Sequence, residues 1–557
     1  MTKYLDGFKP HGPELVREYT ENGAWEGLSY GDLLDRASVQ FPDGIAVIDD
    51  RIRLTYKALR EQVDRFAIAL LELGIRPHDR IMLQLPNRHE FVVALYGMHK
   101  MGAIPMLAVP RHSHRELSTF FSLTEAACWI VPERDQKIEF EPLIKQIRSE
   151  FECLRHVIVP GNGKTLPGTL PMESLIQDIN LENYPDNYLD QYRPDPNDVA
   201  ILSPTGGTTG LPKIVPRTHN SLIVTNRLIS GDLDEKDSLL QATPVGHAMA
   251  MQGAVNSAMY KGATLVLESV PRPTEIMETI QREKVTRVFL VPTQLEGVIN
   301  HPNLKSYDLS SIKVLGTTGA ALPKEIAQKA SDYFINLGCK FSGSALGASE
   351  GILAQGDPDA PIDQQMKTVG RPVTPGSHYK VIDNDGNERP QGQQGELVVK
   401  GPEVFTGYYK TSEEETQNIF TPDGYYRTGD LAKIDGQGYI RITGRIKDVI
   451  QRGGETLVPG EMEDLIRKHP SVESAAVVGM PDPKLGERAC AYVVTKPGKA
   501  FNFQEMIAFL KTQGAGVLLF PERLELVDAL PVTEIGKIDK KELLKDIEQK
   551  LKQEKVI

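Results

Sequence analysis

The chain has 557 residues, of which 40% are hydrophobic and 25% charged, and its formal net charge at pH 7 is -12. This length exceeds one ordinary domain and predicts a large composite domain followed by a smaller one. The acidic balance argues against a nucleic-acid-binding face. The cysteines, Cys128, Cys153, Cys339 and Cys490, form no CxxC pair. Their spacing argues against a disulfide framework or a structural zinc site and fits a reducing cytoplasm.

Neither the N-terminus nor any inner segment predicts a membrane anchor. The first nine residues are too polar to supply the apolar region of a secretory signal. The most apolar long segment, 91–110, is interrupted by His99, Lys100 and Gly102. It is more typical of a core helix that runs into a strand than of a membrane span. We therefore expect a cytoplasmic enzyme with no membrane span.

In the first 300 residues, short β-rich runs alternate with helical patterns. Apolar residues at helical spacing predict a helix over 55–74, stopped by Gly74. The alternation indicates layered α/β architecture with largely parallel sheets. The Pro/Gly-rich stretches 160–172 and 184–198 predict surface loops. The other predicted elements are strands at 80–85, 103–108, 263–267 and 288–291 and helices at 88–100 and 274–284.

A glycine- and threonine-rich loop, Ser203-Pro-Thr-Gly-Gly-Thr-Thr-Gly-Leu-Pro-Lys213, follows the apolar run 199–202. Glycines let the backbone approach an anion, while hydroxyls and a lysine supply donors for a nucleoside triphosphate. The spacing differs from the Walker pattern, and taken alone the loop also fits a flexible hairpin turn. The candidate phosphate ligands are Thr205, Gly206, Gly207, Thr208, Thr209, Gly210 and Lys213.

Three further charged residues stand in turns that suit nucleotide chemistry. Glu350, in Gly347-Ala-Ser-Glu-Gly351, could hold Mg²⁺ against triphosphate oxygens. Asp430, in Tyr425-Tyr-Arg-Thr-Gly-Asp430, could accept hydrogen bonds from ribose hydroxyls, and Arg445 offers a cation for the same sugar. Taken singly, each also fits an ordinary surface or turn residue.

From about residue 376 the sequence predicts a β-rich subdomain, with strands at 379–383 and 395–401 and tight Asp-Gly turns. The segment 443–454 is expected to be a junction, and the last 110 residues could form a separate small domain. The tail, 537–554, is rich in Lys and Glu and predicts a solvated terminal helix. Charge pattern alone makes Lys537 a solvated lysine.

Taken together and in this order, these motifs resemble the superfamily of acyl- and aryl-adenylate-forming enzymes. The resemblance covers nearly the whole chain, and its most specific parts are the 205–213 loop, Tyr-Arg-Thr-Gly-Asp430, Gly444-Arg-Ile-Lys-Asp and Gly536-Lys-Ile. Pro216-Arg-Thr-His-Asn220 and Arg452-Gly-Gly-Glu455 look like the stand-alone aryl-acid ligases that act on 2,3-dihydroxybenzoate or salicylate.

The resemblance implies a fold and a reaction. The fold is α/β, with a large N-terminal domain (1–446) of layered α/β subdomains plus a β-rich subdomain, and a small mobile α+β domain (447–557). The reaction joins a carboxylic acid, expected to be an aryl acid, to AMP from ATP with Mg²⁺, releases pyrophosphate, and passes the acyl group to a phosphopantetheine thiol of a carrier protein. CoA as acceptor, in an acyl-CoA synthetase, is the alternative; a non-catalytic nucleotide-binding protein is a remote one.

The resemblance also implies residue roles. The loop Thr205–Gly210 with Lys213 would hold the β- and γ-phosphates, Glu350 the Mg²⁺, and Asp430 with Arg445 the ribose. Lys537 would be the catalytic lysine at the substrate carboxylate and α-phosphate, and stabilise charge there. The remaining roles are the adenine segment Gly319, Ala320 and Ala321, the hinge Lys447 and the thiol tunnel at Gly454.

The acid pocket is where the chain departs from its look-alikes. His247 matches the gate histidine of the family, although it also fits a satisfied histidine on an apolar helix. The dihydroxybenzoate ligases continue with asparagine and tyrosine and then a serine, whereas this chain has Ala248, Met249 and Gly253. A pocket without a hydroxyl partner favours a plainer or bulkier acid, unless Met249 simply packs its helix.

Overall fold

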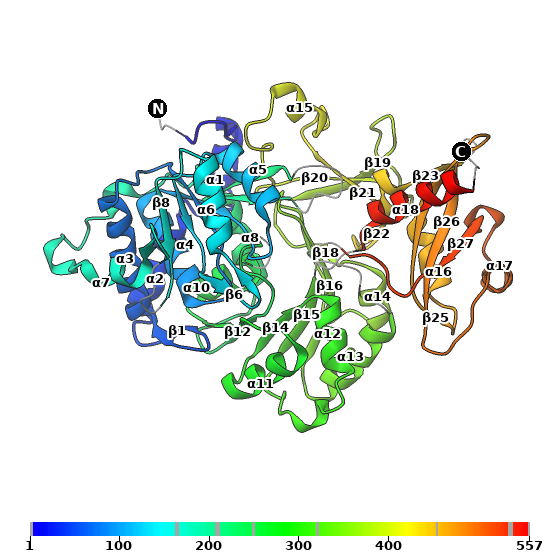
Figure 1. The fold of residues 1–557 in the computed structure, drawn as a ribbon, viewed down its shortest axis with the longest axis horizontal. Coiled ribbons are helices and arrows are strands. Elements are labelled where there is room, and N and C mark those ends of the chain that lie inside the picture. Colours follow the sequence, from blue (N-terminus) through cyan, green and yellow to red (C-terminus); the bar gives the residue numbers. More distant parts are fainter. Residues whose placement is uncertain are drawn as a thin grey trace. The chain divides into compact units, whose positions relative to one another are not determined.

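The computed structural model describes residues 4–161, 166–205, 212–247, 251–318, 322, 324–452, 455–532 and 538–554 (Figure 1). Contacts between Cα atoms divide the chain into two units. The first comprises residues 1–378 and 400–424, and the second comprises residues 379–399 and 425–557. The predicted domain boundary after residue 446 lies within the second unit and stays a prediction.

The first unit contains a seven-stranded sheet in the order β11-β10-β4-β3-β5-β8-β9. Its strands are parallel except for β10 and β11, which form an antiparallel pair at one edge. The strands are β3 (Arg80–Leu83), β4 (Ile104–Leu107), β5 (Cys128–Ile130), β8 (His156–Val159), β9 (Leu170–Pro171), β10 (Val199–Pro204) and β11 (Ile214–Thr218). Helices and a small hairpin accompany it: α1 (Pro13–Glu21), α2 (Tyr30–Gln40), α3 (Tyr56–Glu72), α4 (His89–Met101), α5 (His114–Thr124), β6 (Arg134–Asp135), β7 (Ile138–Glu139), α6 (Glu141–Glu150) and α7 (Met172–Asp178).

A nine-stranded sheet in the same unit has the order β18-β17-β16-β15-β14-β12-β13-β1-β2. Its central strands are parallel, as the alternation of strand and helix predicts. The strands are β1 (Ile45–Ile48), β2 (Arg53–Thr55), β12 (Ser238–Gln241), β13 (Thr264–Leu267), β14 (Arg287–Leu290), β15 (Val314–Thr318), β16 (Lys340–Gly347), β17 (Leu353–Gln355) and β18 (Arg371–Pro372). The accompanying helices are α8 (His219–Ser230), the π-helical turn η3 (Met251–Asn256), α10 (Ser257–Lys261), α11 (Pro273–Glu283), α12 (Pro292–Ile299), α13 (Lys324–Asn336) and α14 (Ile362–Lys367). The short helix α15 (Glu413–Asn418) belongs to the same unit but lies away from this sheet (Figure 1).

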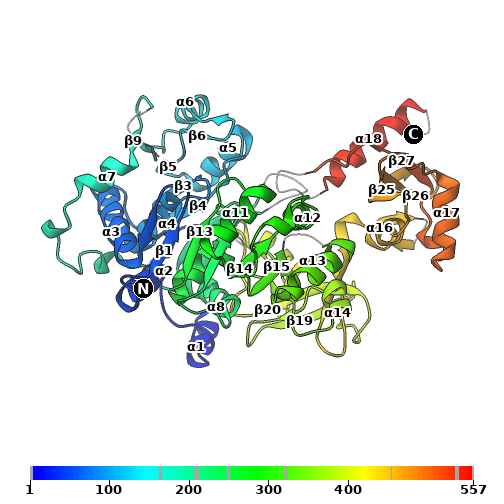
Figure 2. The ribbon, with the colours of Figure 1, turned by 90° about the horizontal axis from the view of Figure 1, so that it is seen from below.

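Apolar side chains of the helices pack on both sheets of the first unit. The largest core joins side chains of both sheets, such as Leu83 and Leu265, with Phe66 of α3 and Phe91 of α4. A separate core lies between the nine-stranded sheet and α11, α12 and α13, which run beside β14 and β15 (Figures 1 and 2). Parallel strands buried on both faces leave their carboxyl ends as the open edge where α/β folds place ligands.

The second unit contains two sheets. The first is an antiparallel four-stranded sheet, β19-β20-β21-β22, and the second contains the long hairpin β25–β26, with β27 parallel to β26. The strands are β19 (His378–Ile382), β20 (Gly395–Lys400), β21 (Tyr426–Ile434), β22 (Ile440–Arg445), β23 (Ile450–Arg452), β24 (Glu455–Leu457), β25 (Val472–Asp482), β26 (Gly486–Thr495) and β27 (Arg523–Leu526). The helices are α16 (Pro459–Ile466), α17 (Phe503–Thr512) and α18 (Lys540–Gln553).

Between these elements, the described residues also form short 3-10 turns. They are η1 (Leu181–Asn183), η2 (Asp190–Tyr192), η4 (Leu304–Ser306), η5 (Ile446–Asp448) and η6 (Val517–Leu519). No helix within the described ranges is long and apolar enough to cross a membrane.

The predicted helices and strands of the first 300 residues are confirmed within a few residues at their ends. Helix α3 begins at Tyr56, where Thr55 accepts a hydrogen bond from the backbone N–H of Ala58, and ends before Gly74 as predicted. The buried residues Leu59, Val63, Phe66 and Leu70 have the helical spacing that predicted it.

Among the described residues, the predicted loop 160–172 is irregular until the two-residue strand β9, which pairs with β8, and 184–198 contains only the 3-10 turn η2. The prediction of a solvated terminal helix is wrong in part. Helix α18 is not simply solvated, because Leu543, Ile547 and Leu551 are buried in a core with residues of β25 and β26. These three residues recur every four positions, a helical periodicity that the many lysines and glutamates obscured.

Candidate active site

The base of the glycine- and threonine-rich loop is closed by hydrogen bonds between its two ends. The backbone N–H of Thr205 donates to the carbonyl oxygen of Lys213 at 2.9 Å. The backbone N–H of Lys213 in turn donates to Oγ1 of Thr205 at 3.2 Å. The two residues extend the antiparallel β10–β11 pair by one step at the edge of the seven-stranded sheet. Gly206, Gly207, Thr208, Thr209 and Gly210 lie outside the described residues, and their phosphate roles stay predictions.

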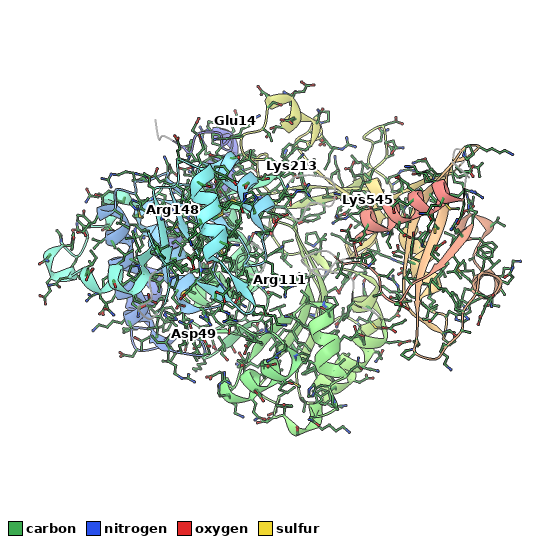
Figure 3. The ribbon with its side chains drawn as sticks, in the orientation of Figure 1. Glu14, Asp49, Arg111, Arg148, Lys213 and Lys545 are labelled. Carbon is green, nitrogen blue, oxygen red and sulfur yellow. The ribbon has the colours of Figure 1, made fainter. Side chains whose placement is uncertain are left out.

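Lys213, Tyr408 and Glu350, here called the phosphate cluster, bring together two of the predicted charges. Lys213, labelled in Figure 3, has its Nζ 4.6 Å from the centre of the Tyr408 ring, within cation–π range. The Tyr408 hydroxyl donates to Oε1 of Glu350 at 3.0 Å. The candidate phosphate cation and the candidate metal ligand therefore share one tyrosine. Sequence reasoning missed Tyr408, since only its place after Gly407 marks it.

Arg217 of β11 anchors the segments that carry Glu350 and Tyr408. Its guanidinium donates to the carbonyl oxygens of Ser349 at 2.9 Å, Glu403 at 2.7 Å and Ser221 at 3.0 Å. The residue is only 1% exposed. Burial lowers the pKa of Arg217 to about 10, which the nearby Glu403 and Glu350 oppose, so the side chain keeps its charge at neutral pH. Arg217 stood within a motif of the family resemblance, but the motif gave no sign of these long-range contacts.

The carboxyl ends of β15 and β16 form the next part of the site. Thr317 Oγ1 donates to the carbonyl oxygen of Gly343 at 3.1 Å and lies 3.3 Å from Oγ of Ser344. These contacts cross between neighbouring parallel strands at the sheet edge where ligands bind in open α/β folds. The predicted adenine segment, Gly319, Ala320 and Ala321, follows β15 directly and lies outside the described residues.

His247 lies in a turn fixed by close packing. A Cβ at the preceding Gly246 would collide with the carbonyl oxygen of Ala108, so only glycine lets this turn approach the end of β4. Asn87 holds the same turn, because its amide donates to the carbonyl oxygens of Gln241 and Thr243 and accepts from the backbone of Val245.

His247 also has a second histidine in electrostatic range. Burial lowers the pKa of His112 to about 4, Glu116 opposes that shift, and His247 adds to it. Gly253 lies in η3, and a Cβ there would meet open space. Ala248 and Met249 lie outside the described residues.

In the second unit, Asp430 and Arg445 face each other across β21 and β22. The Nε of Arg445 lies 3.0 Å from Oδ1 of Asp430. The Asp430 side chain is 13% exposed and that of Arg445 is 43% exposed. Gly429 has φ +71°, a left-handed conformation that glycine adopts without strain, and it lies inside β21, where the pairing with β20 is irregular, directly before Asp430. A carboxylate held in this way can accept hydrogen bonds from vicinal hydroxyls.

The predicted hinge Lys447 lies in η5, directly after this pair. Loss of hydration lowers the pKa of Lys447, and the charges of Arg445 and Lys541 act in the same direction while Asp448 opposes them. Val532 and Ile538 pair in an antiparallel bridge. Lys537 and Gly454 lie outside the described residues, so the catalytic and tunnel roles stay predictions.

One group of potential metal ligands occurs elsewhere in the described part of the chain. Asp49, His89 and Glu90 place ligand atoms within 4.8 Å of one another. His89 Nδ1 lies 2.6 Å from Oδ2 of Asp49, and Arg51 donates to Oε1 of Glu90 at 3.0 Å. Although burial opposes ionisation, the hydrogen bonds from His89 lower the pKa of Asp49 to about 2. Because Arg51 and His89 already balance both carboxylates, we interpret the group as an ion-pair network; Figure 3 shows Asp49 well apart from Lys213.

Comparison with known families decides the class of protein. The profile of the AMP-binding enzyme family matches residues 34–409, and that of the AMP-binding enzyme C-terminal domain matches residues 461–537. This chain belongs to the AMP-binding enzyme family. It is an adenylate-forming ligase that uses ATP, and its fold matches the α/β architecture that the resemblance implied.

Named relatives cover nearly the full length of this AMP-binding enzyme. The 2,3-dihydroxybenzoate-AMP ligase of Bacillus subtilis is 34% identical over 98% of this chain and 99% of its own. The salicyl-AMP ligase / salicyl-S-ArCP synthetase of Mycobacterium tuberculosis is 34% identical over 98% and 95%. The apo structure of MbtA from Mycobacterium smegmatis is 33% identical, with a TM-score of 0.73, over 98% of this chain and 100% of that chain. The resemblance to aryl-acid AMP ligases is therefore confirmed.

Proposed function

We propose that the enzyme activates an aromatic carboxylic acid and loads it onto the phosphopantetheine thiol of a carrier protein. The relatives that match over nearly their whole length are named for aryl-acid adenylation, and one is named for forming a salicyl thioester on a carrier. Among the described residues, the observation that carries the proposal is the phosphate cluster, which gathers a cation and a carboxylate beside the base of the phosphate loop.

The reaction has two balanced steps. In the first, a carboxylate oxygen of the acid attacks the α-phosphorus of ATP, the bond from that phosphorus to the bridging oxygen breaks, and pyrophosphate leaves. In the second, the thiol loses its proton, its sulfur attacks the acyl carbon, and AMP leaves with the electron pair of the broken C–O bond. Two anions must meet in the first step, so cations placed at the phosphates stabilise its transition state.

The residues of the phosphate cluster fit a magnesium ion. Mg²⁺ is held in such sites by one or two carboxylates together with phosphate oxygens and water. Glu350 supplies one carboxylate, and the hydroxyl of Tyr408 fixes its orientation. When bound, the ion would offset charge on the triphosphate oxygens. Lys213, kept near by the Tyr408 ring, would pair with the β- and γ-phosphates.

The other proposed roles follow the family resemblance. Asp430 with Arg445 would hold the ribose, and Lys537 would stabilise the charge at the α-phosphate. Lys447 would be the backbone hinge of a mobile C-terminal domain, and Gly454 would line the path of the thiol. The segment Gly319, Ala320 and Ala321 would contact adenine.

The acid pocket would be bounded by His247, Ala248, Met249 and Gly253. Alanine and methionine cannot hydrogen-bond a substrate hydroxyl, so we propose an acid that lacks the 2-hydroxyl of dihydroxybenzoate or does not depend on it. The packing of Gly246 on Ala108 holds the start of this pocket in place.

Acid-dependent exchange of labelled pyrophosphate into ATP tests the proposal. A panel of aryl and alkyl acids is offered to the full-length enzyme with Mg²⁺, and then carrier protein or CoA is added to measure AMP release. We expect exchange with aromatic acids and thioester formation on the carrier. Exchange with alkyl acids alone would overturn the proposed substrate class. If none of the acids supports exchange, the whole proposal is overturned.

A further inference from the structure

A cavity of about 610 Å³ lies in the first unit, on the nine-stranded sheet. Arg287, Val314 and Lys340, the first residues of β14, β15 and β16, line one side of it. Because these strands are parallel, their first residues mark the edge opposite to the nucleotide edge. The facing side includes Gly253 of η3 and Ser257 of α10. The cavity thus runs from the amino edge of the sheet to a residue of the proposed acid pocket.

The inner end of the cavity is shaped by side chains that lie flat on the sheet. Phe289 and Ser342 line it, and both pack over Gly316 of β15. A Cβ at Gly316 would lie 2.6 Å from the Phe289 ring and 2.6 Å from Oγ of Ser342, so only glycine lets the ring settle there. Across from them, nothing lies within 4 Å of the Cβ position of Gly253. The boundary at Gly253 therefore presents no side chain.

The charges at the mouth of the cavity already have partners. Arg287 pairs with Asp232 at 2.9 Å, Arg371 with Asp357 at 2.9 Å, and Lys340 with Asp359 at 3.3 Å. These pairs leave no net attraction for a second anionic group. The rest of the lining is largely apolar, for example Leu239, Val314 and Phe289. Both features favour an uncharged occupant.

Besides the paired charges and a few serines such as Ser257 and Ser342, the lining offers few polar groups. Pockets of 300–1,000 Å³ that are mostly apolar with a few placed polar groups are typical small-molecule sites.

We propose that the acid pocket continues past Gly253 into this cavity, and that the enzyme therefore selects an enlarged aromatic acid. The acid would be bicyclic or carry a bulky, uncharged substituent distal to its carboxylate. This inference rests on the proposed function, because it takes Gly253 as the far boundary of the acid pocket. Gly253 is then a specificity determinant, since a side chain there would close the passage.

Pyrophosphate exchange with two acids tests the inference. Benzoate is the single-ring probe, and 6-methoxy-2-naphthoate is the enlarged probe with an ether oxygen. We expect the full-length enzyme to show kcat/KM at least tenfold higher for the naphthoate. Val314→Phe, which fills the cavity from β15, should lower the naphthoate-to-benzoate ratio at least tenfold. Val39→Phe makes the same change at a side chain that is 73% exposed and should leave the ratio unchanged.

One further variant protects the test against misfolding. Val373→Trp narrows the cavity at a half-buried position outside any strand or helix, and should lower the same ratio if Val314→Phe fails to fold.

The outcomes separate this inference from the proposed function. Aromatic acids that support exchange, with a naphthoate-to-benzoate ratio that neither Val314→Phe nor Val373→Trp changes, would overturn the continued pocket and leave the proposed function standing. A ratio below one in the unmodified enzyme would overturn it too. Absence of exchange with every acid would contradict the proposed function, and the inference would fall with it.

Discussion

In the first unit, the phosphate cluster is assembled from three segments that are far apart in the sequence, whereas in the second unit Asp430 and Arg445 face each other across one pair of strands. The cluster depends on Arg217, a fully buried cation that binds three carbonyl oxygens. The Asp430–Arg445 pair depends on a local β-hairpin and is partly exposed. We infer that the phosphate cluster depends on the packing of the first unit, whereas the Asp430–Arg445 pair depends on local strand pairing alone.

The largest effect is expected when Arg217, which anchors the phosphate cluster, is replaced. Arg217→Met leaves buried carbonyl acceptors without donors and should lower the free energy of unfolding by about 3 kcal/mol. It should also reduce pyrophosphate exchange, because Ser349 and Glu403 lose their shared partner. Urea unfolding and exchange measure the two effects. Arg115→Met, on an exposed position of α5, is the control, and an equally small effect of both variants would refute the anchor.

The next largest effect is expected on the rate of catalysis, with the stability of the fold unchanged. Glu350→Gln keeps the size of the side chain but removes its charge, and should lower kcat for pyrophosphate exchange about 10²–10³-fold, comparable to loss of one electrostatic contact in other active sites. Its unfolding midpoint should stay close to that of the unmodified enzyme. Glu413→Gln, at a side chain 76% exposed, supplies the control. Unchanged exchange in Glu350→Gln would remove this residue from the metal site.

A smaller effect is expected at the Asp430–Arg445 pair. Asp430→Asn should raise KM for ATP about tenfold, because a charged acceptor of hydrogen bonds becomes a neutral one, worth about 1.5 kcal/mol. Arg445→Gln should change stability by less than about 1 kcal/mol, since the pair is partly exposed. Steady-state kinetics and thermal unfolding measure these values. A loss of stability as large as that of Arg217→Met would contradict the contrast between the two regions.

The smallest effect is a pH dependence of stability in the first unit, at the Asp49–His89 pair. The pKa of Asp49 is lowered to about 2, so the stability that this carboxylate adds to the folded state is present above pH 4 and is lost as the pH falls toward 2. Although burial opposes it, the hydrogen bond and charge of Asp49, with Glu90, raise the pKa of His89. The stability that the His89 side chain adds is therefore present below pH 6.5 and is lost as the pH rises through the raised pKa.

Urea unfolding at pH 3, 5.5 and 8.5 measures both arms of this dependence. Asp49→Asn should flatten the acid arm, and His89→Gln should flatten the alkaline arm. Parallel pH profiles for the unmodified protein and both variants would show that the pair does not stabilise the fold.

The sequence predicted those parts of the fold that local patterns determine. Helix α3 and strands β3, β4, β13 and β14 follow from hydrophobic periodicity, and the hairpin position of Thr205 and Lys213 follows from a strand that enters a glycine-rich turn. The family resemblance supplied the pairing of Asp430 with Arg445, and the structure places the two side chains in contact.

The rest of the site depends on contacts that no local pattern encodes. Tyr408 contacts Glu350 and Lys213 only because chain segments distant in sequence pack together. The three carbonyl partners of Arg217 belong to separate segments, and a carbonyl oxygen leaves no mark in a sequence. The same reason applies to the cavity beside Gly253, whose walls come from α8, η3, α10 and six strands of the nine-stranded sheet.

The most direct test of the central claim, that the phosphate cluster acts as one site for ATP, is a double-mutant cycle in acid-dependent pyrophosphate exchange. It compares the unmodified enzyme with Tyr408→Phe, Glu350→Gln and the double variant, with Tyr409→Phe as the control. Tyr408→Phe keeps the ring for Lys213 and removes the hydroxyl that orients Glu350, and should lower exchange about tenfold. The account predicts that the double variant is no slower than Glu350→Gln alone. Losses that multiply, so that the double variant is about tenfold slower still, would contradict it.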